Sequence, residues 1–189
     1  MKTIIKNNLE ENIKIINNLI SNDLDKIVEI AKMIIKIYQK KGKLFICGNG
    51  GSAADAQHIA AEMINHFKIK RKALPAIALT TDTSILTSIG NDLNFNEIFS
   101  RQIEALSSKK DILIAISTSG NSQNILNAVK EAQTIGMKTI GLTGKNGGKL
   151  SSMVDINVNI PSNNTAHIQE MHITILHNIC ELVEKFIES

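Results

Sequence analysis

Two loops of small polar residues, each placed directly after an apolar stretch, carry the residue types best suited to bind an anion. The first loop is 49–52, with the sequence Asn-Gly-Gly-Ser, and the second is 117–122. Neither contains Lys or Arg. A strand that ends in glycine and serine ahead of a helix leaves backbone N–H groups and hydroxyls at the positive end of the helix dipole, which suits a phosphate. Two such loops in one sheet predict a ligand with a phosphate at one end and hydroxyls along its length, such as a sugar phosphate.

The hydroxyl side chains of the second loop have a simpler alternative explanation. Ser and Thr are common at the start of a helix because their side chains cap its free N–H groups. However, 117–122 contains four hydroxyl residues in six positions, which is more than capping needs. The phosphate site is therefore the favoured interpretation.

The helix expected after the first loop carries His58 and Glu62, four residues apart. Both lie on one face of a helix, with Asp55 one turn earlier, and the packing side consists of Ala56, Ile59, Ala60, Met63 and Phe67. A His and a carboxylate one turn apart can share a metal ion or a proton. An isolated pair of this type is more often an exposed contact worth a few tenths of a kcal/mol. Because this pair follows a ligand loop directly, a functional role is favoured.

The last helix, expected over 163–187, carries Gln169 and His177 on neighbouring faces, roughly 12 Å apart along the axis. Two side chains so far apart converge on one ion only by reaching toward each other or by acting in a pocket between subunits. Taken alone, each His of this helix is more often a surface or core residue than a ligand.

Short apolar stretches separated by helical patterns predict the sheet that positions these residues. Continuous rather than alternating apolar strands indicate burial on both faces, which is typical of a parallel sheet between two helical layers. The fold class expected is α/β, a three-layer αβα sandwich whose ligand binds at the carboxyl ends of the strands, near the point where strand order reverses. The five strands are expected at 44–48, 74–79, 112–116, 138–143 and 154–160.

Helical apolar spacing over 4–20 and 23–41, broken at Ser21-Asn22-Asp23, predicts an N-terminal helical hairpin. The C-terminal helix is apolar on more than one side, so it is expected to pack on more than one neighbour. Together these helices favour a homo-oligomer, formed through helix-bundle contacts between subunits.

The chain of 189 residues is long enough for one domain with a real core and too short for two of ordinary size. We expect a single domain over 1–189, with the helical hairpin in 1–41, the α/β core in 42–162 and the last helix in 163–189. Cys47 and Cys180 sit on apolar stretches without a CxxC pattern and are expected to be reduced core residues.

Composition excludes several classes of protein. No apolar run approaches the roughly 20 residues that span a bilayer, and the first residues lack the pattern of a signal peptide, so no membrane association and a cytoplasmic location are expected. The net charge is +3, but there is no Trp, one Tyr and no basic stripe interleaved with aromatics, so nucleic-acid binding is not indicated. The basic cluster 68–72 is interpreted as a solvated loop.

Four longer stretches resemble a single family. They are CGNGGSAADAQHIAAE (47–62), GNDLNFNEIFSRQIEAL (90–106), ISTSGNSQNILNAVKEA (116–132) and HIQEMHITILHNICELVE (167–184). In this order they are similar to the phosphoheptose isomerases, the sedoheptulose 7-phosphate isomerases of the sugar isomerase (SIS) superfamily, and the resemblance runs almost end to end. It implies a flavodoxin-like SIS domain, a homotetramer, and conversion of sedoheptulose 7-phosphate to D-glycero-D-manno-heptose 7-phosphate through a cis-enediol, for lipopolysaccharide or capsule.

The resemblance also implies roles for particular residues. One zinc ion per subunit would be held by His58, Glu62, Gln169 and His177. Glu62 is expected to be the base at one carbon and His177 the acid/base on the other side. Substrate contacts are expected from Glu62 and Gln169 and from three further groups, the first loop, an Asn-Asp pair and the serine loop: Asn49, Gly50, Gly51, Ser52, Asn91, Asp92, Ser117, Thr118, Ser119 and Ser122.

One departure from the family pattern leaves alternatives open. Many relatives have a Gly-Arg pair shortly after the glutamate, where this chain has Asn65-His66. If that arginine holds the anionic end of the substrate, His66 or the cluster 68–72 must replace it, or affinity drops. The same departure favours, as one alternative, an isomerase that acts on another phosphosugar. A second alternative is a non-catalytic SIS protein that binds a phosphosugar or the replication initiator DnaA.

Overall fold

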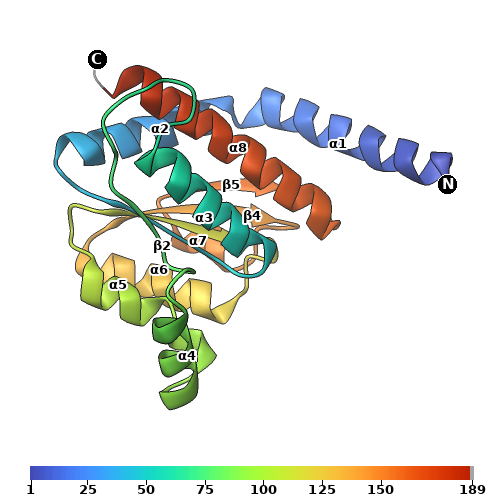
Figure 1. Ribbon diagram of the computed structural model, residues 1–189. Coiled ribbons are helices and arrows are strands. Elements are labelled where there is room, and N and C mark those ends of the chain that lie inside the picture. The colour runs from blue at the N-terminus through green and yellow to red at the C-terminus, as the bar shows by residue number, and fades with distance from the viewer. Residues whose placement is uncertain (188–189) are drawn as a thin grey trace.

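A five-stranded, all-parallel sheet in the order β2-β1-β3-β4-β5 forms the middle layer of the computed structural model, which describes residues 1–187 (Figure 1). Every expected strand is present, so the three-layer α/β prediction is confirmed. The strands β1 and β3 are buried along their whole length, as their continuous apolar sequences predict. The bounds are β1 Leu44–Gly48, β2 Ala76–Ala78, β3 Ile112–Ser117, β4 Lys138–Gly144 and β5 Ile156–Ile160.

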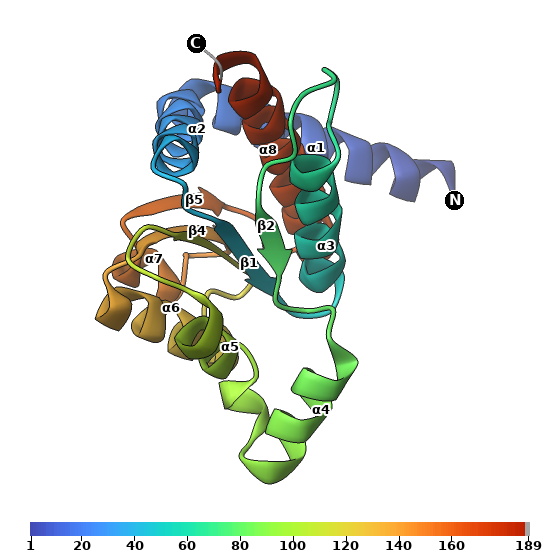
Figure 2. The same cartoon turned by 60° about the vertical axis from the view of Figure 1, so that its left-hand side comes forward.

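Helices cover both faces of the sheet (Figure 2). One layer contains α1 (Lys2–Asn22), α2 (Leu24–Gln39), α3 (Gly51–Ile64) and α8 (Thr165–Phe186). The opposite layer contains α5 (Ser100–Leu106), α6 (Gln123–Ile135) and α7 (Leu150–Met153). Successive strand residues alternate between the two cores: Ile46 packs with α2, α3 and α8, whereas Phe45 and Cys47 pack with α5 and α6. In residues 1–187 no helix is long and apolar enough to cross a bilayer.

The sheet places the two polar loops side by side. The strand β1 pairs with both β2 and β3, so the order of strands reverses there, and Gly48 at the end of β1 pairs with Ile116 near the end of β3. The loops that follow these strands therefore leave the same edge of the sheet. This is the point where open parallel sheets bind their ligands.

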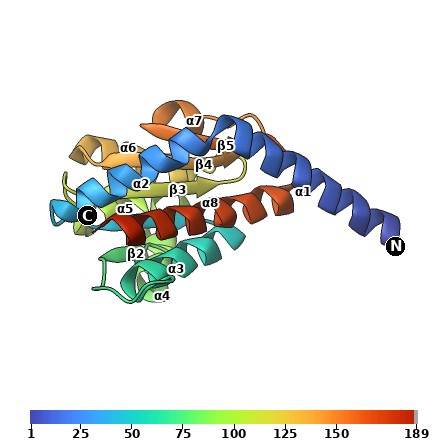
Figure 3. The ribbon, with the colours of Figure 1, turned by 90° about the horizontal axis from the view of Figure 1, so that it is seen from above.

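The two N-terminal helices do not form the expected hairpin. Figures 1 and 3 show α1 extending beyond the end of α2 instead of folding back beside it. Only Asp23 separates them, and helical hydrogen bonding continues through it, because its N–H donates to the Leu19 carbonyl and its own carbonyl accepts from Ile27. Reversal of two helices takes a loop of about 2–5 residues. The single residue Asp23 cannot provide such a turn.

A helix that follows β2 projects from the body of the fold. The helix α4 (Thr83–Asp92) has no buried residue and precedes the turn η1 (Phe95–Glu97). In Figures 1 and 2, α4 stands apart from the layers. Its first turn is capped by Asp82, whose carboxylate accepts the Ile85 N–H at 2.9 Å.

Candidate active site

The first loop contains a glycine with positive φ and is tied to a neighbouring helix by a pair of amide side chains. Gly50 has φ +57°, a conformation that favours glycine, and a Cβ there would contact nothing within 4 Å. Asn49 and Asn124, the second residue of α6, exchange two side-chain hydrogen bonds of 2.9 and 2.8 Å. Asn124 is buried and also accepts the Ile125 N–H. The amide pair thus ties the loop after β1 to the helix after β3.

The hydroxyls of the second loop lie together at the start of α6. The Ser117 hydroxyl lies 3.1 Å from that of Ser122 and 3.5 Å from that of Ser119. Ser122 occupies the capping position of α6 but makes no side-chain capping bond. The simple capping explanation therefore does not account for Ser122. Its hydroxyl and the unpaired N–H groups of the first turn of α6 are arranged to accept an anion.

Three side chains from α3 and α8 approach one another along the packed faces of these two helices. Nε2 of His58 lies 3.2 Å from Oε1 of Glu62 and 3.5 Å from Nε2 of His177. The two imidazole rings meet edge to face, with centroids 4.9 Å apart at 76°. The i, i+4 spacing of His58 and Glu62 predicts their contact, and the packing of α8 on α3 adds His177.

Gln169 lies near the start of α8, where it approaches the first loop. A Cβ placed on Gly51 would come within 2.6 Å of Nε2 and 2.8 Å of Oε1 of Gln169. The lack of a side chain at Gly51 is what allows Gln169 to approach the start of α3. The long helix α8 therefore delivers Gln169 to the loop and His177 to the His58–Glu62 pair.

Burial and neighbouring charges shift two titrating groups here. Burial first, and then His58 and Lys68, lower the pKa of His177, while Glu62 raises it in opposition. A lowered pKa keeps this imidazole neutral near pH 7, so that it can accept a proton or bind a metal. Burial raises the pKa of Asp55, against an opposing effect of His58.

The donor types of this group are those that zinc prefers. Imidazole nitrogen and carboxylate oxygen are usual zinc ligands, and catalytic zinc sites keep a position open for water or substrate. Within residues 1–187, no three His, Cys, Asp or Glu side chains are arranged as they stand to hold a metal ion. His58, Glu62 and His177 have the donor atoms of such a site and lie near one another, but their donor atoms do not surround a common point.

Comparison with known proteins adds the deciding observation. Residues 9–144 match the SIS domain family. The chain is 55% identical over 154 residues to a phosphoheptose isomerase of Aliarcobacter butzleri, covering 82% of each chain. It also superposes on the structure of phosphoheptose isomerase GmhA from Neisseria gonorrhoeae with a TM-score of 0.92 and 42% identity, covering 97% of this chain and 98% of that one.

The chain belongs to the phosphoheptose isomerase family. A second solved structure, a phosphoheptose isomerase from Francisella tularensis, agrees at 41% identity and a TM-score of 0.91 over 97% of each chain. The resemblance that the four motifs predict is thus confirmed, and so is the α/β SIS fold.

One expected pair of substrate contacts lies on the helix α4. Asn91 and Asp92 end the projecting helix α4, where the Asn91 amide donates to the Asp92 carboxylate at 2.8 Å. In the described part of the chain, no hydrogen bond joins either residue to 49–52 or 117–122. Their contact with the substrate stays a prediction.

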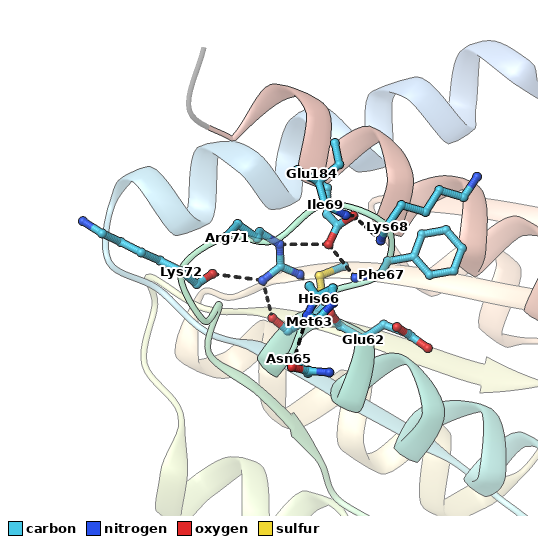
Figure 4. A network of polar contacts seen from close by, with 10 residues as sticks. All are labelled: Glu62, Met63, Asn65, His66, Phe67, Lys68, Ile69, Arg71, Lys72 and Glu184. Carbon is cyan, nitrogen blue, oxygen red and sulfur yellow. Dashed lines mark hydrogen bonds and ion pairs between the residues drawn. The ribbon is translucent and has the colours of Figure 1, made fainter.

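The basic cluster is only partly the solvated loop that the sequence predicts. Lys68, Lys70 and Lys72 are exposed, but the side chain of Arg71 is only 4% exposed and forms an ion pair of 3.2 Å with Glu184 (Figure 4). His66 contacts Asn65, with its Nδ1 3.2 Å from the Asn65 amide oxygen. Arg71 is therefore occupied within the fold and does not replace the arginine that many phosphoheptose isomerases carry after the glutamate.

Two residues near the site are not predicted as site residues by the sequence. Asn124 follows the serine loop, and only the approach of β1 to β3 shows that it faces Asn49. Phe67 is predicted on the packing side of the helix after the first loop, but α3 ends at Ile64 and Phe67 lies beyond it. There its ring stacks on His177, with centroids 5.2 Å apart and planes 11° apart.

Proposed function

We propose that this chain is a phosphoheptose isomerase that converts sedoheptulose 7-phosphate to D-glycero-D-manno-heptose 7-phosphate in heptose biosynthesis. The observation that carries this is the approach of His58, Glu62 and His177 to one another, in a chain that belongs to this family. A non-catalytic SIS protein would not need this acid/base group, so the enzyme is favoured over a binding protein.

The serine loop would hold the phosphate of the substrate. Ser117, Ser119 and Ser122 already present clustered hydroxyls at the start of α6, and Thr118 lies between them in the sequence. A helix start supplies N–H donors and a positive dipole end, so this anion site needs no lysine or arginine. The first loop, 49–52, would contact sugar hydroxyls next to it.

Two residues would move the protons. Isomerisation through an enediol requires a base that moves a proton between C1 and C2 and an acid that serves the two oxygens. We assign the role of the base to Glu62, whose carboxylate lies 3.2 Å from His58. We assign the acid/base on the other side to His177, because its lowered pKa favours a neutral imidazole that can take and return a proton.

We also propose a zinc ion held by His58, Glu62, Gln169 and His177. The donor types and the pairwise approach of the first three support it, as does the position of Gln169 over Gly51. Zinc bound there would orient substrate oxygens and polarise the carbonyl. A carboxylate bound tightly to zinc is a poor base, so the proposal requires Glu62 to be released from the metal during turnover or the metal to act mainly in orientation.

We propose that the chain forms a homo-oligomer. The family resemblance implies that this oligomer is a tetramer. The helix α1 buries only Ile15 and Leu19 within the chain. Its other large apolar residues are exposed by 38% to 66%: Ile4, Ile5, Leu9, Ile13, Ile16 and Ile20. An unpartnered stripe of this length on a helix that leaves the body of the fold supports helix-bundle contacts between subunits. The proposed setting is the cytoplasm.

The direct test is conversion of sedoheptulose 7-phosphate by purified protein, before and after chelation and with zinc restored. We expect turnover that falls on chelation and returns with zinc. The variant Glu62→Gln should fold and bind substrate but lose most activity, because an amide cannot accept the proton. Turnover of Glu62→Gln near the wild-type rate would refute the role of Glu62. No turnover by the zinc-loaded wild type would refute the proposed reaction.

A further inference from the structure

A buried carboxylate near the end of α8 holds the segment that follows α3. Glu184 accepts the backbone N–H groups of Phe67, Lys68 and Ile69 at 2.5, 2.8 and 3.1 Å, and it pairs with Arg71. The Glu184 side chain is 1% exposed. Burial alone would raise the pKa of Glu184, but the three N–H donors and the Arg71 charge outweigh it and lower the pKa. A charged carboxylate that accepts three N–H groups and pairs with an arginine fixes the path of this backbone.

Arg71, which pairs with Glu184, caps the C-terminal end of α3. The Arg71 guanidinium donates to the backbone carbonyls of Glu62 and Met63 at 2.9 and 2.8 Å, and to that of Lys72 at 3.0 Å (Figure 4). The first two carbonyls belong to the last turn of α3, where a cation also offsets the negative end of the helix dipole. The ion pair therefore joins the backbone that carries Glu62 to the helix that carries His177.

The fixed backbone places one aromatic ring against the site. Phe67, with its N–H bound by Glu184, stacks flat on the His177 imidazole at 5.2 Å and 11°. On another side, His58 meets the same imidazole edge to face. Lys68 reaches over the Phe67 ring, 5.3 Å from its centroid, and pairs with Glu181 at 2.6 Å. The His177 ring is thus confined by two rings.

We propose that Phe67 is a positioning residue for the isomerisation, held in place by the Glu184–Arg71 ion pair, and that its ring fixes the orientation of the His177 imidazole. This inference rests on the proposed function. A proton-transfer group must hold its acceptor atom in line with the substrate, and a misplacement of about 1 Å can cost on the order of a hundredfold in rate. Removal of the Phe67 ring leaves the His177 imidazole held by His58 alone, while the residues of the substrate loops are not altered.

The variants Phe67→Leu and Phe67→Tyr separate this role from packing. Leucine fills much of the same space without a flat ring, whereas tyrosine keeps the ring. We expect Phe67→Leu to lower kcat about tenfold, with KM changed by less than about twofold, and Phe67→Tyr to restore kcat. The matched control is Ile69→Ala on the same segment, because the Ile69 side chain is 46% exposed and only its backbone meets Glu184.

An NMR measurement on the metal-free protein tests the stacking without reliance on activity. The ring protons of His177, assigned by their loss in His177→Gln, should be shifted upfield by the Phe67 ring in wild type and Phe67→Tyr. The shift should be lost in Phe67→Leu and reduced in Glu184→Gln, which weakens the attachment of the segment. If Glu184→Gln does not fold, the comparison of the Phe67 variants still decides.

The outcomes of the two experiments are distinguishable. An unchanged His177 shift in Phe67→Leu would overturn the inference, as would a kcat loss in Ile69→Ala equal to that in Phe67→Leu. Failure of the wild type to convert sedoheptulose 7-phosphate would instead refute the proposed function, and the stacking would still be measured by the NMR shift.

Discussion

The reciprocal amide pair between Asn49 and Asn124 should couple the two loops in energy as well as in space. We expect the variants Asn49→Ala and Asn124→Ala to destabilise the protein by less together than the sum of their separate effects. Each single variant removes both hydrogen bonds and leaves one amide without its partner. The double variant removes the same two bonds but leaves neither amide behind.

The size of the effect follows from the two bonds. A hydrogen bond in a protein contributes about 0.5–1.5 kcal/mol net, so two bonds give a coupling free energy of about 2 kcal/mol. Asn124 is 3% exposed, and a buried polar group left unpaired costs about 1–3 kcal/mol more. We therefore expect Asn49→Ala to lower the free energy of unfolding by more than the loss of an exposed amide would, because the buried Asn124 side chain loses its two hydrogen bonds to Asn49.

Urea unfolding of the wild type and the three variants, at one protomer concentration, measures this coupling as a double-mutant cycle. Gln123 and Asn127, joined by one side-chain hydrogen bond of 2.7 Å along α6, provide a control in which a coupling of about 0.2–0.5 kcal/mol is expected. If the effects at Asn49 and Asn124 added to within about 0.5 kcal/mol, the two loops would be independent and the reasoning would be wrong.

Three further predictions concern other parts of the molecule. Gly51→Ala should displace the Gln169 side chain, which lies 2.6 Å from the new Cβ, and lower activity about tenfold while the melting temperature stays near that of wild type. Burial lowers the pKa of His172 from 6.5 to about 4, so folding stability should fall as the pH drops from 6.5 to 4, by about 3 kcal/mol more than in His172→Gln, as followed by urea unfolding. Leu9→Lys with Ile13→Lys should give a smaller species by light scattering with unchanged helix content by circular dichroism, because both positions are exposed apolar residues of α1.

The sheet could be predicted from the sequence because its strands are buried on both faces. Phe45 packs into the core on one face of the sheet, and its neighbour Ile46 packs into the core on the other face. The strand therefore has no solvent-exposed face, and its sequence is apolar throughout instead of alternating with polar residues. The hairpin could not be predicted correctly, because apolar spacing identifies helices but not the direction in which the chain leaves Asp23. That direction depends on hydrogen bonds across one residue.

The candidate site likewise contains some contacts that the sequence predicts and others that it does not. The contact of His58 with Glu62 follows from local helix geometry, and the sequence predicts it. The contacts of His177 with Phe67 and of Gln169 with Gly51 depend on how α8 packs against α3, which no local spacing encodes. Resemblance to the family predicts Gln169 and His177 as ligands, but it does not predict the contact of Phe67 with His177 or that of Asn124 with Asn49.

The placement of two site residues on α8 has a consequence for synthesis of the protein. Among the described elements α8 is the last to leave the ribosome, and it carries both Gln169 and His177. It also supplies buried residues to the core shared with α2 and α3, such as Ile175 and Ile179. A nascent chain that lacks α8 therefore exposes apolar surface and has no complete site. The proposed activity should therefore appear only after residue 177, and the rest of α8 with it, has left the ribosome.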